Sequence, residues 1–583
     1  MDIFSVFTLF GGLAFFLYGM NVMSSGLERM AGGKLESTLL KMTSNKFLAL
    51  LFGAGITAVI QSSSAMTVML VGLVNSGIMQ FGQTISVLMG SNIGTTITAW
   101  ILSLAGIDGD TWYISILKPS NFAAAFAFIG ILLQMVSKSD KKKTLGGVFI
   151  GFAVLMFGMD LMSGAMKPLG ENETFRSILT AFKNPILAVL FGAAFTGIIQ
   201  SSSASVGILQ ALSIASPITY GIAIPIIMGQ NIGTCITALI ASIGVSKNAK
   251  KVAVVHLSFN IIGTLIILIP LLIINALVDI PFWNDRTNPF MIAICHSIFN
   301  VVTTFILLPF TKFLENFANR VIKSEETVDD GPKLDDRLLT VPGVAVGTAH
   351  DATVEMSHIA IDSFERAIAL MDGYNAVAAD EIKALEEKVD RYEDRLGTYM
   401  VKLAQAKLSE TDSRRISKLL HTINDFERIS DHACNLVLVA EEINEKNIRF
   451  SPEATEEIGT LTQALKEILS LTRNAFDGDV TAAAKVEPLE QVIDKIIAHI
   501  KNNHIDRLQQ GNCTIELGFV LHDLLTNYER VSDHCSNIAV AIIETEHGSF
   551  DTHEYLNAVK SAAEGDFRDA YEEYKSRYIS SAQ

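Results

Sequence analysis

Gln61-Ser62-Ser63-Ser64-Ala65 returns without change as Gln200-Ser201-Ser202-Ser203-Ala204, and both copies lie in apolar sequence. The surrounding residues return at the same offset of 139 positions. Residues 45–103 align without a gap with residues 184–242, and about half of the positions are identical. Internal repeats that carry a polar motif in apolar sequence are typical of membrane transporters. The sequence therefore predicts a transporter built by duplication.

The composition divides the 583-residue chain near residue 318. Residues 1–310 contain 16 Lys and Arg against 11 Asp and Glu, a balance of +5, whereas the whole chain carries −16 and the remainder therefore −21. Apolar stretches that are long enough, or nearly so, to cross about 30 Å of hydrocarbon occur at Phe4 to Met23, Phe122 to Val136, Leu145 to Met166, Val252 to Leu277 and Met291 to Phe310. The first part is predicted to be a polytopic membrane domain, and membrane lipid is its expected surrounding.

We predict an all-α protein in three parts. Residues 1–318 form the membrane domain, with repeat units at about 12–136 and 151–277. Residues 319–347 form a linker, and residues 348–583 form a soluble helical domain. The five cysteines are scattered without a C-x-x-C spacing, which indicates a reducing location for the soluble domain.

Loop charges predict that the two repeats are inverted. The loop at 138–143 is strongly basic, but its counterpart at 277–282 has no Lys or Arg. Basic residues 247–251 in turn match 108–112, which contain two Asp. By the positive-inside rule, the two copies have opposite orientation in the cell membrane. The N-terminus is then outside and the soluble domain cytoplasmic. The alternative is that loop charges merely vary.

The Q-S-S-S segments are predicted to break their helices. Four consecutive polar side chains cannot all face one neighbouring helix, and an unsatisfied polar group in a membrane costs several kcal/mol. A re-entrant hairpin or discontinuous helix solves this problem and lines a polar site. Asn92 to Thr95 and Asn231 to Thr234, both Asn-Ile-Gly-Thr, are predicted to form a second break in each repeat. The alternative is that the Ser and Thr side chains only join helices.

Residues 48–103 and 187–242 contain no charged side chain. A site of hydroxyls, amides and helix ends can hold an oxyanion at helix N-termini and sodium at oxygen ligands. The two bound charges would offset each other. The candidate ligands for substrate and sodium are Gln61, Ser62, Ser63, Ser64, Asn92, Thr95, Gln200, Ser201, Ser202, Ser203, Asn231 and Thr234.

The paired Q-S-S-S motifs, each followed by Gly-x-Asn-Ile-Gly-Thr, resemble the type II sodium/phosphate cotransporter family over most of residues 1–312. The resemblance implies inorganic phosphate as substrate, sodium as coupling ion, and the two Q-S-S-S segments as the central site. Composition and spacing alone do not select phosphate over another small anion.

A second pattern, H-x-x-F-N, occurs at His256 to Asn260 and at His296 to Asn300. It places His and Asn on one helical face at i and i+4. The repeat counterpart of His256 is Leu117, which argues against a symmetric binding role. We expect each His to form a hydrogen bond to another helix, and the alternative is proton or sodium coupling.

The soluble domain is predicted to contain six main helices in two three-helix units. Glu427-Arg428-Ile429-Ser430-Asp431-His432 returns as Glu529-Arg530-Val531-Ser532-Asp533-His534. Carboxylates that converge from adjacent helices form metal sites in helical bundles. The alternative is a salt-bridged surface with Arg428 and Arg530. The candidate metal ligands are Glu386, Asp390, Glu427, Asp431, Glu490, Asp494, Glu529 and Asp533.

These residues resemble the PhoU family of helical regulators of phosphate uptake, over roughly residues 348–575. The resemblance implies a regulatory domain with metal clusters, and a divalent or iron-type metal is expected. Whether His432 and His534 join the metal ligands stays open. A cytoplasmic regulatory partner or a homo-oligomer is the expected assembly, and no nucleic-acid partner is expected.

The sequence thus predicts sodium-coupled phosphate transport by alternating access, regulated by the PhoU-like domain. The first alternative is a phosphate exporter. The second is a membrane-anchored regulator that transports nothing, which the polar breaks in both repeats disfavour. An enzyme is not expected, because the sequence has no Gly-rich nucleotide loop, nucleophile elbow or H-E-x-x-H motif.

Overall fold

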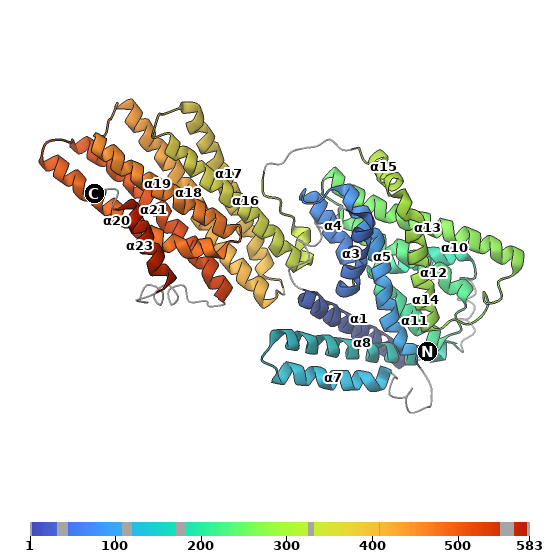
Figure 1. Ribbon diagram of the computed structural model, residues 1–583. Helices are drawn as coiled ribbons and strands as arrows, with labels where there is room; N and C mark the ends of the chain where they lie inside the picture. The colour runs from blue at the N-terminus through green and yellow to red at the C-terminus, as the bar shows by residue number, and fades with distance from the viewer. Residues whose placement is uncertain are drawn as a thin grey trace. The chain divides into compact units, whose positions relative to one another are not determined.

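The computed structural model describes residues 3–31, 45–107, 119–170, 182–323, 331–406, 408–547 and 565–579. In these residues the regular structure is helical, and one isolated bridge joins Thr219 to Arg286. The chain forms two compact units (Figure 1). Residues 1–328 with 335–345 form the membrane unit, and residues 329–334 with 346–583 form the bundle unit. The predicted all-α fold is confirmed.

Six described helical segments of the membrane unit are long and apolar enough to cross a membrane. Two of them, Phe81–Gly106 and Tyr220–Ala241, are absent from the apolar stretches expected from the sequence, because their Asn, Ser and Thr side chains lower the hydropathy. The helices are α1 (Ile3–Ala31), α3 (Lys46–Ile60), α4 (Ser63–Asn75), α5 (Phe81–Ser103), α7 (Pro119–Val136), α8 (Asp140–Gly170), α10 (Pro185–Ile199), α11 (Ser202–Ala215), α12 (Tyr220–Ala241), α13 (Lys247–Val278), α14 (Pro289–Leu307) and α15 (Thr311–Val321), with 3₁₀ turns η1 (Leu104–Gly106), η2 (Leu308–Phe310) and η3 (Asp336–Thr340).

The membrane unit has an apolar outer surface, and many polar side chains are buried beside its apolar core. Polar side chains are inside: Thr57 is 0% exposed and Asn92 is 4% exposed. Large apolar side chains face outward, with Ile198 82% and Leu277 78% exposed. In lipid, apolar surface needs no covering, whereas polar groups must find partners within the protein. This distribution fits a chain surrounded by hydrocarbon.

Glycines let the helices of each repeat pack closely. A Cβ on Gly90 of α5 would lie 1.9 Å from the carbonyl oxygen of Leu50 in α3. The repeat counterpart of Gly90 is Gly229 of α12. A Cβ on Gly229 would lie 2.1 Å from the carbonyl oxygen of Val189 in α10. Small residues spaced four apart allow such backbone contacts between helices in membranes. Gly94 follows Gly90 on α5 at this spacing, and Gly233 follows Gly229 on α12. The pairs α3 with α5 and α10 with α12 are therefore equivalent.

The first hairpin, α3 with α4, begins and ends at one end of the membrane unit. At its beginning, Lys46 Nζ donates a hydrogen bond to Thr311 Oγ1 of α15 (2.6 Å). At its end, Asn75 Oδ1 accepts one from the backbone N–H of Ser246 before α13 (2.7 Å). The start of α5 adjoins both neighbours, because Gly82 lies against Glu315 of α15 and α13 packs on α5. We call this the α4 end.

The second hairpin, α10 with α11, opens to the opposite end. Gln210 near the end of α11 donates from Nε2 to the carbonyl of Ala99, late in α5 (3.0 Å), and to that of Pro289 at the start of α14 (2.9 Å). Since α5 begins at the α4 end, its last turns lie at the other end, which we call the Pro289 end. The two hairpins enter from opposite ends, so the predicted inversion of the repeats is confirmed.

The bundle unit contains two three-helix groups (Figure 1). The buried apolar side chains follow helical spacing, and α18 of the first group packs against α21 of the second. The helices are α16 (Pro342–Ala369), α17 (Ala376–Ala404), α18 (Glu410–Glu445), α19 (Pro452–Phe476), α20 (Val480–Gln509), α21 (Ile515–His547) and α23 (Asp566–Tyr578). The two three-helix units expected from the sequence are present, and α23, which packs on α20, is a further helix beyond the six predicted.

The segment expected as a linker, 319–347, contains regular structure. Helix α15 continues to Val321, η3 occupies 336–340, and α16 begins at Pro342. The first residues of α16, up to Ala345, belong to the membrane unit, and the remainder belongs to the bundle unit. Residues 324–330 of this segment are outside the described part of the chain.

Candidate functional site

Both Q-S-S-S segments break their helices at the glutamine. Gln61 and Gln200 have left-handed backbone conformations, with φ of 60° and 59°. Each ends a helix: the N–H of Gln61 donates to Thr57 O (2.8 Å) and that of Gln200 to Thr196 O (2.7 Å). A non-glycine residue with positive φ is uncommon, and here it recurs at the same position of both repeats. The predicted breaks are confirmed, and each forms the tip of a re-entrant hairpin.

The first serine of each segment caps the following helix. Ser62 Oγ accepts a hydrogen bond from the N–H of Ala65 (3.1 Å), and Ser201 Oγ accepts one from that of Ala204 (3.2 Å). The N–H groups of a first helical turn have no partner inside the helix, and they carry partial positive charge. Each hairpin tip therefore offers backbone donors to an anion.

The remaining serines keep their hydroxyls available. The side chains of Ser63, Ser64, Ser202 and Ser203 form no hydrogen bond with another described residue. Ser63, Ser202 and Ser203 are nevertheless buried, at 4–6% exposure. A hydroxyl can donate to an oxyanion and accept from a donor, and it is also a suitable sodium ligand. Both tips thus present free hydroxyls beside helix N-termini.

The two copies differ in detail. Gln61 is buried, its Nε2 donates to Ala58 O (2.6 Å), and its Oε1 has no partner among the described residues. Gln200 is exposed. Thr57 donates to Ser91 Oγ on α5 (2.8 Å), whereas its counterpart Thr196 donates to Ser205 Oγ on α11 (2.7 Å). The site is therefore pseudo-symmetric, and its two halves are chemically unequal.

The second break predicted at Asn-Ile-Gly-Thr is wrong. Helix α5 continues through Asn92 and Thr95, and α12 continues through Asn231 and Thr234. The polar side chains bond within the helix: Thr95 donates to Ser91 O (3.1 Å), Thr234 to Gln230 O (2.9 Å) and Asn231 to Ile227 O (3.0 Å). The glycines of this motif serve helix contact rather than a turn.

Asn92 instead joins the two repeats. Its Nδ2 donates to Asn260 Oδ1 on α13 (3.3 Å), and Asn260 Nδ2 contacts Cys235 Sγ on α12 (3.3 Å). Asn260 and Cys235 were not candidates from the sequence. The signal that could have identified Asn260 is its place in the first H-x-x-F-N pattern, inside the apolar stretch 252–277.

The expected interhelical hydrogen bonds of the two histidines are not formed. His256 Nδ1 and both ring nitrogens of His296 are buried without a partner in the described residues. The asparagines of the H-x-x-F-N patterns donate to the carbonyl of the histidine one turn earlier: Asn260 to His256 O (3.0 Å), in addition to its contacts with α5 and α12, and Asn300 to His296 O (2.9 Å). Neither pattern links helices through its imidazole.

The second helix of each hairpin also contacts the opposite repeat: α4 lies against α12 and α13, and α11 lies against α5. Within their own repeats α3 packs on α5 and α10 on α12, and α11 packs on α8. Among the residues that the structure describes, no hydrogen bond connects the first Q-S-S-S segment with the second. The candidate ligands are therefore grouped at two tips rather than in one bonded cluster.

In the bundle unit the structure brings the predicted carboxylates together in two acidic groups. Desolvation, followed by the charges of Asp431 and Asp390, raises the pKa of Glu386. Desolvation and Asp431 also raise the pKa of Glu427. The first acidic group therefore brings partly desolvated, mutually repelling carboxylates of α17 and α18 close together.

The second acidic group repeats this arrangement on α20 and α21. Desolvation, followed by Asp533 and Glu529, raises the pKa of Asp494, and desolvation raises that of Asp533. Glu490, the remaining candidate, lies one turn before Asp494 on α20. In the described residues, no three His, Cys, Asp or Glu side chains are placed to hold one metal ion as they stand. Arg530 also lies 3.5 Å from Asp533, as a salt-bridged surface would require.

The two histidines of the repeated motif lie between the three-helix groups. His432 Nδ1 hydrogen-bonds with Asn527 Oδ1 (2.8 Å), and His534 Nδ1 with Asp425 Oδ1 (2.9 Å). Asn527 and Asp425 are themselves equivalent under the 102-residue offset of this repeat. The histidines therefore join α18 to α21 by two equivalent contacts.

Comparisons with known proteins match both halves of the chain. The family described as Na+/Pi-cotransporter matches residues 15–164 and again residues 155–276. The PhoU domain matches residues 353–440 and 458–542. Each family matches twice, in agreement with the two internal repeats.

Three curated relatives illustrate the range of similarity. The chain is 25% identical over 552 residues to "Putative inorganic phosphate export protein YjbB" of Escherichia coli (strain K12), covering 92% of this chain and 97% of that protein. It is 31% identical over 314 residues to "Uncharacterized protein YqeW" of Bacillus subtilis (strain 168), covering 54% and 97%. It is 30% identical over 130 residues to "Sodium-dependent phosphate transport protein 2A" of Rattus norvegicus, covering 22% and 20%. The chain therefore belongs to the Na+/Pi-cotransporter family of phosphate transport proteins and carries a PhoU domain.

Proposed function

We propose that this protein transports inorganic phosphate across the cell membrane together with sodium, by alternating access around the two Q-S-S-S tips. The observation that carries the proposal is the pair of re-entrant hairpins that enter from opposite ends, each with a capped helix start and free serine hydroxyls at its tip. An anchor without transport would have no need of two such tips.

Charge supports binding of an anion and a cation together. The hairpins, α3 with α4 and α10 with α11, hold no charged side chain beyond Lys46 at the first residue of α3. Phosphate bound alone at the tips would bring uncompensated negative charge into a low-dielectric region, which is costly. Sodium at carbonyl and hydroxyl oxygens offsets that charge. Gln61 Oε1, buried without a partner, is a suitable acceptor for such an ion.

The α4 end is proposed to face the cytoplasm. Lys46, Lys247, Lys250, Lys251 and Lys312 are at this end, whereas the segment that leads to Pro289 carries Asp279 and Asp285 against Arg286. The positive-inside rule assigns the basic end to the cytoplasm. The PhoU domain then lies in the cytoplasm, where we propose that it regulates transport, and the N-terminus lies outside.

The direction of net transport distinguishes two versions of the proposal. The relative YjbB is named for phosphate export and the relative from rat for sodium-dependent transport. A site that alternates between both sides can work in either direction, as set by the gradients. Sodium coupling driven by an inward gradient favours uptake, which is the version we propose.

Radiolabelled phosphate uptake into proteoliposomes tests the proposal directly. With purified full-length protein, an inward sodium gradient is expected to drive phosphate accumulation, and an equal potassium gradient is not. Equal uptake under both gradients would remove sodium coupling. Efflux from phosphate-loaded vesicles without any sodium dependence would support the export version instead.

We further propose that the two acidic groups of the bundle unit bind a divalent or iron-type metal. Carboxylates that raise one another's pKa are stabilised when a cation arrives, because it relieves their repulsion. Side-chain rotation is required, since the described carboxylates do not surround one point. Asp431 and Asp533, equivalent in the two repeats, are the best positions for a test.

Replacing Asp431 and Asp533 together with Asn is expected to lower the metal content of the purified protein and to stabilise its metal-free form at neutral pH. Folding raises the pKa of a carboxyl such as Asp533, so the folded state holds its proton more tightly than the unfolded state does. The folded state is therefore destabilised as the pH rises from the ordinary pKa to the raised one, and this loss of stability remains at higher pH. Elemental analysis and thermal unfolding after chelation check both effects. Asp380→Asn with Asp506→Asn, both exposed, is the charge-matched control. Unchanged metal content in the test pair would leave only the salt-bridged surface.

A further inference from the structure

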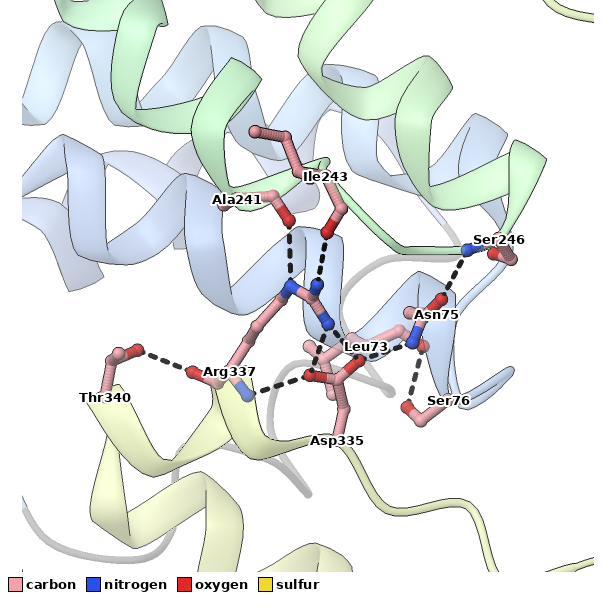
Figure 2. Close-up of polar contacts among 9 residues, drawn as sticks. All are labelled: Leu73, Asn75, Ser76, Ala241, Ile243, Ser246, Asp335, Arg337 and Thr340. Carbon is pink, nitrogen blue, oxygen red and sulfur yellow. Dashed lines mark hydrogen bonds and ion pairs between the residues drawn. The ribbon is translucent and has the colours of Figure 1, made fainter.

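A segment beyond the last membrane-crossing helix belongs to the membrane unit. Residues 335–345 form part of this unit, and η3 within them packs on α4, the helix that follows the first Q-S-S-S tip. We call Asp335–Val341 the latch. Figure 2 shows the side chains of Asp335 and Arg337 directed toward the end of α4 and the end of α12. The contact joins positions about 260 residues apart in sequence.

Arg337 binds the end of α12. Its Nε donates to Ala241 O (2.8 Å) and its Nη2 to Ile243 O (2.8 Å). Carbonyls at a helix C-terminus lack partners within the helix and carry partial negative charge, so a guanidinium is a favourable cap. The planar guanidinium reaches the two carbonyls from two different nitrogens held in a fixed geometry, which the single nitrogen of a lysine does not provide. Arg337 thereby fixes the latch to the second repeat.

Asp335 binds the end of α4. Its Oδ2 accepts a hydrogen bond from Asn75 Nδ2 (2.5 Å), and its Oδ1 lies 3.2 Å from Arg337 Nη1. The Asp335 side chain is only 1% exposed, so this ion pair is not a solvent-screened surface contact. Asn75 also accepts from the N–H of Ser246 (2.7 Å). One amide therefore joins α4, the loop after α12 and the latch.

An apolar contact completes the latch. Leu338 is fully buried and lies over Gly72 of α4. A Cβ at Gly72 would be 2.8 Å from Leu338 Cδ2, so a larger residue at position 72 would displace the leucine. Gly72 leaves space for the Leu338 side chain, and the Asn75 amide, one helical turn later, binds Asp335. We call these two residues of α4 the receptor for the latch, and the space at Gly72 its notch.

The repeat shows that this receptor is specific to one hairpin. The counterparts of Gly72 and Asn75 at the offset of 139 are Ala211 and Ile214. Ala211 has a Cβ where the notch would be, and Ile214 has no polar group. Only the hairpin at the α4 end, which the chain reaches on its way to the bundle unit, carries the receptor. The difference between the copies supports a dedicated contact rather than a packing residue shared by both repeats.

We propose that the latch is an autoinhibitory contact that holds α4 to α12 and must be released for the first hairpin to move. The proposal rests on the proposed transport function, because alternating access requires the two repeats to change their packing. Helix α16 begins directly after Val341 and continues into the bundle unit. A continuous helix transmits displacement along its axis, so the PhoU domain can pull the latch free.

A reversible cross-link tests whether the latch must open. In the full-length chain, Gly72→Cys is combined with Leu338→Cys, since an ideal Cβ at Gly72 lies 3.2 Å from Leu338 Cγ. Sodium-driven phosphate flux in proteoliposomes is expected to fall to background on oxidation and to return on reduction. Each single variant is expected to show the same flux before and after oxidation, which controls for the five native cysteines. Full flux through completely cross-linked protein would overturn the proposal.

Release of the latch gives the opposite effect. Arg337→Ala is expected to raise flux about fivefold or more, at the lower end of couplings between distant sites. Lys333→Ala removes an exposed positive charge two residues before the latch and is expected to change nothing. Lower flux from folded Arg337→Ala protein would show a supporting role and overturn the inhibition.

A readout without transport separates the two proposals. Maleimide labelling of Leu338→Cys, buried while the latch is docked, is expected to become about fivefold faster or more when Arg337→Ala is added. If reduced wild-type protein shows no phosphate flux, the transport proposal fails, and labelling still decides whether Arg337 holds the latch closed. Unchanged labelling would overturn the latch itself.

Discussion

Phosphate uptake is expected to be lost at micromolar phosphate when Ser63 and Ser202 are both replaced with Ala. The two hydroxyls are buried, bonded to no other described residue, and lie in the first turns of α4 and α11. A hydrogen bond to a charged group contributes about 1.5–3 kcal/mol. Each lost hydroxyl should therefore raise the half-saturating phosphate or sodium concentration about tenfold or more.

The measurement is sodium-driven uptake at a series of phosphate and sodium concentrations. Ser103→Ala with Ser213→Ala is the matched control, because these hydroxyls donate to carbonyls three residues back in their own helices. The control is expected to keep wild-type affinity. Wild-type uptake by the test pair, at equal protein in the membrane, would remove both serines from the site.

The single variants separate the two halves of the site. The tips differ at Gln61, which is buried with an unpartnered Oε1, and at Gln200, which is exposed. If one tip binds mainly sodium and the other mainly phosphate, Ser63→Ala and Ser202→Ala shift different concentration curves. Equal shifts in both curves would indicate one site shared by the tips.

The helix breaks could be predicted because their cause is local. Four polar side chains in succession cannot be satisfied on one side of a helix in lipid, and this holds whatever surrounds Gln61 or Gln200. The inverted orientation of the two repeats can also be predicted from the sequence, because the charge of a loop indicates its side of the membrane whatever the helices pack against. The contacts of Lys46 and Gln210 place the two hairpins at opposite ends, as that charge pattern requires.

The Asn-Ile-Gly-Thr motifs were misread because glycine has two uses that one sequence does not separate. Gly94 permits a turn, but it also permits a backbone contact, and the partner atom, Ala54 O, belongs to another helix. Only the placement of α3 beside α5 shows which use applies. For the same reason the sequence alone does not identify α5 and α12 as membrane-spanning helices. Their polar residues lower the hydropathy, and only the structure shows that neighbouring helices cover these residues.

The latch could not be predicted for a related reason. Asp335 and Arg337 read as ordinary charges in a linker, and their partners are Asn75 and the end of α12. A sequence signal did exist in the repeat, where Gly72 and Asn75 depart from Ala211 and Ile214. A residue that differs between the two repeats indicates a role found in one repeat only, but the difference does not identify the residue that it contacts.

Gly90→Ala and Gly229→Ala are each expected to destabilise the protein severely. The new Cβ would lie 1.9 Å from Leu50 O in the first case and 2.1 Å from Val189 O in the second. Both neighbours are backbone atoms, so no side chain can rotate away, and the cost should exceed the usual 1–3 kcal/mol of overpacking, by about a further factor of two. This loss outweighs the gain of about 1 kcal/mol that alanine gives in a helix interior.

Heat resistance of the detergent-purified protein, followed by size-exclusion chromatography, checks this expectation. Gly55→Ala is the matched control on α3, because a Cβ there meets nothing within 4 Å and the substitution should preserve or raise stability. A Gly90→Ala protein as resistant as the wild type would mean that α3 and α5 do not touch at this point. That contact also sets the position of Gln61 at the tip of α3, so Gly90→Ala protein that survives folding should transport poorly even when the tip serines are intact.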